Sequence, residues 1–187
     1  MNSSQKKIYL TFDEGPIPTI TSWVLDVLKL HNIAATFFCV GENVVKHPEL
    51  FQRIITEKHS VGNHTYHHLN GWKTHTDKYL QNVEKCAEVV NSKLFRPPYG
   101  RLKKSQYSML IPIATETQYS IIMWDILSGD YDKNTSPEKC LNNITGTVRN
   151  GSIIVFHDSY KAKKNIEYTL PRFIEYAKTK GFEFGVL

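Results

Sequence analysis

Residues 10–16, LTFDEGP, carry an apolar run that begins at Ile8 straight into two adjacent acids, Asp13 and Glu14. A Gly-Pro pair follows at once and ends the run. Two neighbouring carboxylates repel each other unless a cation or a shared proton offsets their charge. Acids and Gly-Pro are also ordinary turn residues. The stretch therefore predicts a strand that ends either in an exposed acidic turn or in a metal site, a general base, or both.

The composition around this stretch is that of one globular domain. The chain has 187 residues, 41% of them hydrophobic and 22% charged, which is enough for a substantial core. Its net charge of +5 is spread along the sequence and is compatible with an anionic polymer such as a cell wall. No basic stripe interleaved with aromatic residues indicates a nucleic-acid partner. No apolar run reaches the roughly 20 residues that cross a bilayer.

The first residues form a polar segment. We expect residues 1–7 to be a polar tail or a cloning remnant, and residues 8–187 to form a single domain. The segment does not resemble a signal peptide, so we expect a cytoplasmic protein, or one whose leader or anchor has been removed. Three widely spaced cysteines, Cys39, Cys86 and Cys140, form no CxxC pair and predict buried free thiols. The sequence carries no sign of the oligomeric state.

Short apolar runs rich in β-formers alternate with amphipathic helical patterns along the chain. The runs lie at 8–12, 34–40, 60–63, 94–96, 120–124, 152–157 and 182–186. The helical patterns lie at 19–31, 49–58, 76–91, 137–148 and 165–180. Within 103–117, Pro112 predicts a short helix followed by an irregular turn. Such alternation predicts a parallel α/β fold, either a barrel or an open doubly wound sheet.

Histidines follow the third predicted strand. His64 and His68 are four residues apart, so on one helical turn their imidazoles would share a face and bind one ion, with His67 pointing away. Glu14 would complete a set of two histidines and one carboxylate, which suits a catalytic zinc or a similar divalent ion. The alternative is a histidine-rich surface turn, because other histidines lie nearby.

Arg96 follows the fourth predicted strand, in the stretch 96–100, RPPYG. Its guanidinium would hold a strand-end carboxylate ionised and fixed in orientation. The alternative is a surface arginine beside a proline turn. The two prolines stiffen the loop and would present the backbone N–H groups of Tyr99 and Gly100 to an oxyanion.

His157 ends the sixth predicted strand. It is either a structural strand-end residue or a general acid, and in the second case Asp130 would orient it and raise its pKa. Asp125 and Asp158 are interpreted as turn and cap acids. Polar, reactive groups therefore follow five of the predicted strands, as they do in a barrel whose active site lies at the C-terminal ends of its strands.

Five motifs, in order and each at a strand end, resemble those of the polysaccharide deacetylases of carbohydrate esterase family 4, the NodB-type homology domain. They are 11–16 (TFDEGP), 64–68 (HTYHH), 96–100 (RPPYG), 130–131 (DY) and 154–157 (IVFH). The resemblance spans residues 8–187. It implies a distorted (β/α) barrel with about seven parallel strands. It also implies a hydrolase that removes N-acetyl groups from a poly- or oligosaccharide containing N-acetylglucosamine, such as peptidoglycan or chitin.

The resemblance further implies a divalent cofactor, Zn²⁺ first and Co²⁺, Ni²⁺ or Mn²⁺ as alternatives. Carried over by position, Asp13 is the general base for the attacking water, and Arg96 fixes it. Glu14, His64 and His68 bind the metal. His157, oriented by Asp130, protonates the leaving amine. The residues implied to line the acetyl pocket and the sugar subsite are Tyr99, Trp124, Tyr131 and Ile154.

Three positions depart from the family pattern. Glu14 replaces an aspartate, Leu127 replaces the first aspartate of the fourth motif, and Tyr131 replaces a tryptophan. Two alternative functions follow: a carbohydrate-binding module with a weakened metal site, or an esterase that acts on O-acetyl polysaccharides. A metal-free reaction on a cyclic amide is disfavoured because both histidines and a carboxylate are present. The expected partner is an N-acetylated glycan.

Overall fold

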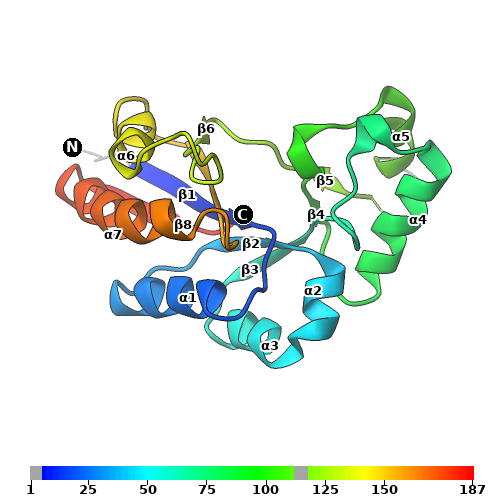
Figure 1. The fold of residues 1–187 in the computed structure, drawn as a ribbon, viewed down its shortest axis with the longest axis horizontal. Helices are drawn as coiled ribbons and strands as arrows, with labels where there is room; N and C mark the ends of the chain where they lie inside the picture. The colour runs from blue at the N-terminus through cyan, green and yellow to red at the C-terminus, as the bar shows by residue number, and fades with distance from the viewer. Residues whose placement is uncertain (1–5, 112–117) are drawn as a thin grey trace, which may run out of the picture.

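The structure, a computed structural model, describes residues 6–111 and 118–187. At its centre lies β1 (Lys6–Asp13), which pairs in parallel with β2 (Thr36–Cys39) on one side and β7 (Ile153–His157) on the other. A further parallel strand, β8 (Phe182–Gly185), pairs with the first half of β1 (Figure 1). The strand predicted at 8–12 is confirmed and begins earlier than expected, at Lys6.

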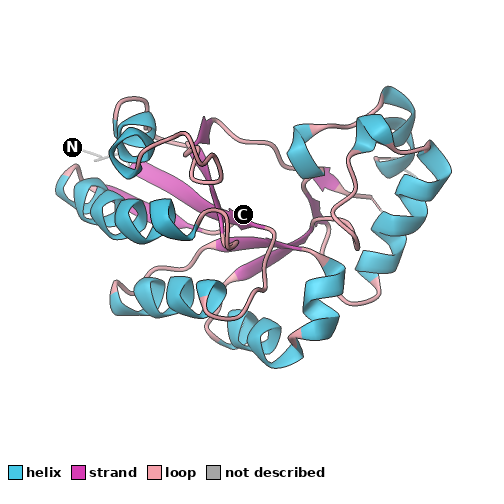
Figure 2. Ribbon diagram, in the orientation of Figure 1, coloured by secondary structure: helices cyan, strands magenta, loops and turns pink. Residues whose placement is uncertain are grey.

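Four short strands extend the sheet on both sides of this centre. Beyond β2 lie β3 (Ser60–Asn63), β4 (Leu94–Phe95) and β5 (Ser120–Ile121), and beyond β7 lies β6 (Ile126–Leu127). In the described part of the chain β5 and β6 do not pair with each other. The curled sheet is therefore a half-barrel with one open side (Figure 2). This confirms the predicted distorted barrel, and the two-residue β6 is the strand that the prediction missed.

Seven α-helices of the described residues surround the sheet on its outer side (Figures 1 and 2). They are α1 (Ile20–Leu30), α2 (Gly41–Lys46), α3 (Pro48–Thr56), α4 (Thr76–Ala87), α5 (Lys104–Leu110), α6 (Pro137–Thr145) and α7 (Lys163–Thr179). The sequence predicted all of them except the short α2. Two 3₁₀ turns, Gly71–Lys73 and Pro98–Gly100, complete the described helical structure. The irregular turn expected after α5 falls on residues 112–117, which lie outside the described residues.

The two faces of the central strand differ in chemistry. Ile8, Leu10 and Phe12 are fully buried in the hydrophobic core, where the Phe12 ring stacks on Phe37 with centroids 4.9 Å apart. The alternate residues Thr11 and Asp13 point to the other side of the sheet, because successive side chains of a strand face opposite ways. The polar side of β1 thus lines the inside of the half-barrel. The C-terminal ends of the parallel strands lie together at one edge of it.

Two predictions about the whole chain can be compared with the fold. All three cysteines are buried free thiols, as expected. Within residues 6–111 and 118–187, no helix combines the length and the apolar character needed to span a membrane.

Candidate active site

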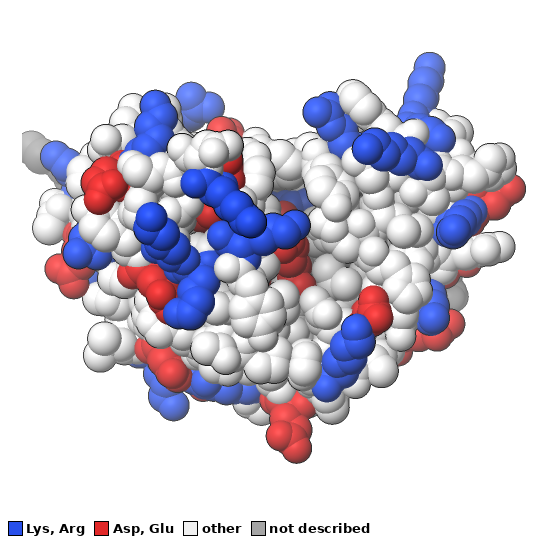
Figure 3. Space-filling view, viewed as in Figure 1, with Lys and Arg blue, Asp and Glu red and all other residues white. Residues whose placement is uncertain are grey.

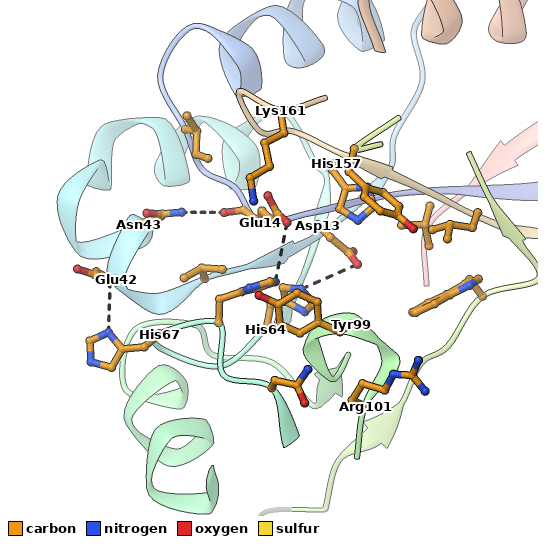
Figure 4. Close-up of a pocket in the computed structure, with 18 residues that line it drawn as sticks. Asp13, Glu14, Glu42, Asn43, His64, His67, Tyr99, Arg101, His157 and Lys161 are labelled. Carbon is orange, nitrogen blue, oxygen red and sulfur yellow. Dashed lines mark hydrogen bonds and ion pairs between the residues drawn. The ribbon is translucent and has the colours of Figure 1, made fainter. Parts of the chain in front are cut away.

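A pocket of about 620 Å³ opens at the C-terminal ends of the strands, where a barrel enzyme carries its active site. Most of the predicted site residues line it: Asp13, Glu14, His64, His68, Tyr99, Trp124, Tyr131 and His157. Figure 4 shows Asp13, His64 and His157 converging from segments that are far apart in the sequence. Arg96 and Asp130 lie directly behind the pocket and contact its residues.

Asp13 is held as a carboxylate by Arg96. The Arg96 Nη1 donates to Asp13 Oδ1 at 2.7 Å, and both side chains are almost completely buried. Burial by itself raises the pKa of Asp13, but the charges of Arg96 and of nearby histidines more than offset this, so the pKa is lowered. The second carboxylate oxygen, Oδ2, faces His64 Nε2 at 4.0 Å. Asp13 is therefore ionised at neutral pH, as a general base must be.

Arg96 also joins parts of the sheet that do not otherwise meet. Its Nη1 donates to Thr11 Oγ1 at 2.7 Å. Its Nε donates to the carbonyl of Ile122 at 3.2 Å, and Nη2 donates to that of Met123 at 3.1 Å. These two carbonyls belong to the link between β5 and β6, at the open side of the half-barrel. The guanidinium also stacks on the Phe38 ring at 4.0 Å, so four hydrogen bonds and an aromatic face hold this buried cation.

His157 and Asp130 form a second buried pair. His157 Nδ1–H donates to Asp130 Oδ1 at 2.8 Å, and the backbone N–H of His157 donates to Oδ2 at 2.8 Å. Burial lowers the pKa of His157, but the Asp130 carboxylate outweighs it and raises the pKa to about 9. His157 is therefore protonated at neutral pH and can donate a proton. It is also the register partner of Asp13 on the neighbouring strand, so base and acid lie side by side.

His64 is presented to the pocket as a neutral imidazole. Its Nδ1–H donates to the Arg96 carbonyl at 2.7 Å, which leaves Nε2 as the free ring nitrogen. Burial is the main cause that lowers the pKa of His64 to about 3. A neutral imidazole whose second nitrogen is held by a carbonyl is the usual state of a metal-binding histidine.

The other two predicted metal ligands lie next to His64. The ring centroids of His64 and His68 are 5.0 Å apart, and His68 Nε2 lies 4.0 Å from Glu14 Oε1. Two ligands of a tetrahedral zinc, with bonds of about 2.1 Å, are about 3.4 Å apart. Among the described residues no three His, Cys, Asp or Glu side chains are close enough to share an ion as they stand. The donor types fit a divalent ion, and small side-chain movements must bring them together.

The loop that carries these histidines is not the helical turn that their spacing predicts. Residues 64–69 contain no helix, and Thr65 and His68 have positive φ values of 61° and 53°. Asn82 of α4 shapes this loop: its Oδ1 accepts the backbone N–H groups of Tyr66 and His67, each at 2.9 Å. His67 points away from His64, as expected, and its ring lies beside Glu42 at the edge of the pocket (Figure 4).

Asp158 was interpreted as a cap acid and instead fixes the loop that carries Glu14. Its carboxylate accepts the backbone N–H of Gly15 at 2.9 Å and the hydroxyl of Thr21 at 2.5 Å. A Cβ on Gly15 would lie 2.0 Å from Asp158 Oδ2, so only glycine allows this approach. Burial raises the pKa of Asp158 to about 7. In the sequence, only its position next to His157 indicated that Asp158 lies near the site.

Ile154 is a correction to the predicted site. Its side chain is fully buried in the hydrophobic core and does not line the pocket. Val155 and His157 line the pocket instead. Because side chains alternate along β7, a residue next to Val155 must face the other side of the sheet. Leu127, at the position of a missing aspartate, adds an apolar wall to the pocket.

The predicted oxyanion donors differ in availability. The backbone N–H of Gly100 already donates to the Pro97 carbonyl at 3.0 Å, which leaves Tyr99 as the candidate of the two. Tyr99 has a positive φ of 60°, and its ring packs edge-on against His68 with centroids 4.7 Å apart. On the opposite wall the Tyr131 ring packs in the same way against His157, at 4.9 Å. Aromatic rings thus flank both the metal-ligand side and the acid side of the pocket.

Comparison with known proteins agrees with this geometry. Residues 1–119 match the polysaccharide deacetylase family. Over 98% of its length the chain is 36% identical to a peptidoglycan-N-acetylglucosamine deacetylase of Bacillus cereus, of which it covers 68%. It is 31% identical, over 97% of its length, to the peptidoglycan-N-acetylglucosamine deacetylase PgdA of Listeria monocytogenes, of which it covers 38%.

A solved structure is also similar. The fold superposes on the crystal structure of a peptidoglycan N-acetylglucosamine deacetylase in complex with 4-naphthalen-1-yl-N-oxidanyl-benzamide, with a TM-score of 0.89 and 35% identity. The match covers 98% of this chain and 87% of that one. The sequence match, the half-barrel and the motif residues gathered at its strand ends lead to one conclusion: the chain belongs to the polysaccharide deacetylase family.

Proposed function

We propose that this chain is a metal-dependent hydrolase that removes the acetyl group from N-acetylglucosamine units of a poly- or oligosaccharide. The observation that carries the proposal is the pairing of an ionised carboxylate with a protonated imidazole on neighbouring strands. Asp13 is held ionised by Arg96, and His157 is held protonated by Asp130. Amide hydrolysis needs both, since one group takes a proton from water and the other gives a proton to the amine.

The reaction uses these two groups in sequence. Asp13 removes a proton from the water that attacks the acetyl carbonyl. Tyr99 lines the pocket, and its backbone N–H would donate to the oxygen that becomes negative. His157 then gives its Nε2 proton to the sugar nitrogen as the C–N bond breaks, because Nδ1 is already engaged by Asp130. Acetate and the free amine leave.

The metal part of the proposal rests on the donor set. Glu14, His64 and His68 would hold a divalent ion, with the open coordination that two histidines and one carboxylate leave. When bound, such an ion polarises the carbonyl oxygen and lowers the pKa of water. The hydrogen bond from His64 to the Arg96 carbonyl fixes the ring so that Nε2 faces the pocket. Zinc suits these ligands, and Co²⁺, Ni²⁺ and Mn²⁺ are the alternatives.

The test combines acetate release with metal analysis on the purified chain. Wild type should release acetate from a chitin- or peptidoglycan-type oligomer, and a chelator should abolish the release. Asp13→Asn should lower kcat by about 10²-fold or more while zinc stays bound. His64→Ala should lose the zinc. The matched control is His75→Ala, because His75 is an exposed histidine outside the pocket.

Different failures point to different errors. Release that survives chelation in a metal-free protein contradicts the metal part alone. Acetate from acetylxylan but from no N-acetyl oligomer identifies an O-acetyl esterase. A zinc-loaded protein that binds the oligomer and releases no acetate is a binding module. The buried acid and base argue against that last outcome, because a binder has no need of them.

A further inference from the structure

The pocket holds two cations for which the proposed reaction has no use. Lys161, in the loop between β7 and α7, and Arg101, directly after the Pro98–Gly100 turn, both line it. Figure 4 draws Lys161 beyond Glu14 on one side of the pocket and Arg101 beyond Tyr99 on the other. Both side chains are exposed, and neither forms an ion pair with another described residue.

Two of the three acids that line the pocket already have cationic partners. Asp13 is paired with Arg96 at 2.7 Å. Glu42 accepts from Lys46 at 2.7 Å and lies 3.2 Å from His67. Glu14 is the remaining acid, and the proposed metal ion would more than neutralise it. Lys161 and Arg101 therefore keep an uncompensated positive charge at the two edges of the pocket, while the negative charges inside it are neutralised. This arrangement attracts anions.

Figure 3 shows this distribution on the surface. Acidic atoms (red) lie inside the hollow near the centre of this face, and basic side chains (blue) lie along its edges. Lys161 lines the same pocket as Asp13 and His157, so it lies where a sugar next to the reacting one would enter.

Arg101 is held ready for contact by a stacking partner. Its guanidinium lies 4.1 Å from the ring centroid of Trp72, a cation–π contact that fixes the side chain and leaves its edge N–H groups open. A planar guanidinium with free edge donors recognises carboxylates in a bidentate manner. Trp72 is 57% exposed, so the pair offers both an apolar surface and a positive charge to a bound glycan.

We propose that Lys161 and Arg101, on opposite sides of the pocket, each bind a carboxylate carried by the glycan next to the reacting N-acetyl sugar, and so make this enzyme prefer an acidic N-acetylated glycan to a neutral one. The inference rests on the proposed deacetylation. It assigns the two residues to substrate selection and leaves the chemistry to Asp13 and His157. Each carboxylate would lie at an edge of the pocket, where the contact adds binding energy before and during the reaction.

The test uses one oligosaccharide in two charge states. The acidic probe is an oligomer of alternating N-acetylglucosamine and N-acetylmuramic acid, and the neutral probe is the same oligomer with each lactyl carboxylate converted to a methylamide. Wild type should show a higher kcat/KM on the acidic probe. Lys161→Met and Arg101→Met should each lower the acidic-to-neutral ratio by about two- to fivefold, chiefly through KM, and the double variant by about tenfold.

Controls make the outcome decisive. Lys164→Met removes an exposed lysine in the first turn of α7, outside the pocket, and should leave the ratio unchanged. Added salt should lower the wild-type ratio, because ions screen exposed charges. Equal kcat/KM on the two probes, or variants that slow both equally, would overturn the assignment while deacetylation stands. Absence of acetate from both probes would instead contradict the proposed function.

Discussion

At the scale of single residues, the environment of His157 sets the upper pH limit of activity. The pKa of His157 is raised to about 9, so the proton it must donate is present below that pH and is lost as the pH rises through it. The pKa of Asp13 is lowered, so the base is ionised well into the acidic range. We expect kcat/KM to be flat around neutral pH and to fall above about pH 9.

Asp130→Asn tests the origin of this limit. Without the carboxylate, burial remains and lowers the pKa of His157, so the falling limb of the pH profile should move below its wild-type position. The rate at neutral pH should drop by about 10²-fold. The measurement is kcat/KM from about pH 5 to about pH 10.5 for both proteins. A limb that stays near pH 9 in the variant would show that another group causes it.

Ile154 belongs to the hydrophobic core and not to the pocket. Ile154 was predicted to touch substrate, but it is fully buried among core residues. Ile154→Ala should therefore lower the free energy of unfolding by about 2 to 5 kcal/mol in chemical denaturation. The milder Ile154→Val should cost about 1 kcal/mol and leave KM unchanged. A raised KM in a fully folded Ile154→Val protein would show that Ile154 does contact the substrate.

At the scale of elements, the loop between β1 and α1 depends on a contact from β7. The carboxylate of Asp158, just after β7, holds Gly15 and Thr21, and the backbone N–H of Asp158 donates to the Asp13 carbonyl at 3.2 Å. Gly15→Ala would place a methyl group against this carboxylate. We expect a loss of about 1 to 3 kcal/mol of stability and weaker metal binding, since Glu14 must move.

A double-mutant cycle isolates this contact. In an Asp158→Ala background the clash partner is gone, so Gly15→Ala should cost less than it does in wild type. Gly146→Ala serves as a control, because Gly146 ends α6 with an ordinary φ of −76°. Unfolding free energies and zinc titrations of the four proteins give the coupling. Additive costs would mean that Asp158 does not restrain Gly15.

Sequence patterns predicted the longer elements of the fold but not the shortest ones. Strands such as β1 and β7 were predicted within one or two residues, because apolar runs and the turn residues after them mark these strands. The short β6 and α2 were missed, since two or six residues give no period to detect. The motif residues were found because they follow strands. The restraints from Asn82 and Asp158 were not, because each joins residues far apart in the chain, and only packing brings them together.

At the scale of the whole molecule, the half-barrel is arranged so that one edge carries all the chemistry. The apolar side of the central strands packs against the helices, and the polar side faces the interior and the pocket. The C-terminus helps to complete the wall: the Leu187 N–H donates to Thr36 Oγ1 at 3.0 Å, and the Leu187 carbonyl accepts from the Ser60 hydroxyl at 3.0 Å. The last strand, β8, also pairs with the first, β1, so the two ends of the described chain meet at the central strand.

The guanidinium of Arg96 has a consequence for anyone who redesigns this enzyme. It takes the place of a strand between β5 and β6, because it donates hydrogen bonds to the Ile122 and Met123 carbonyls there. It also holds Asp13, the proposed base. A substitution of Arg96 that is meant to change the pKa of Asp13 would also remove the hydrogen bonds to the Ile122 and Met123 carbonyls. Loss of activity in such a variant would therefore not report on the base alone. Thr11 touches the same nitrogen without touching the open side. Basicity should therefore be adjusted from Thr11, and Arg96 left in place.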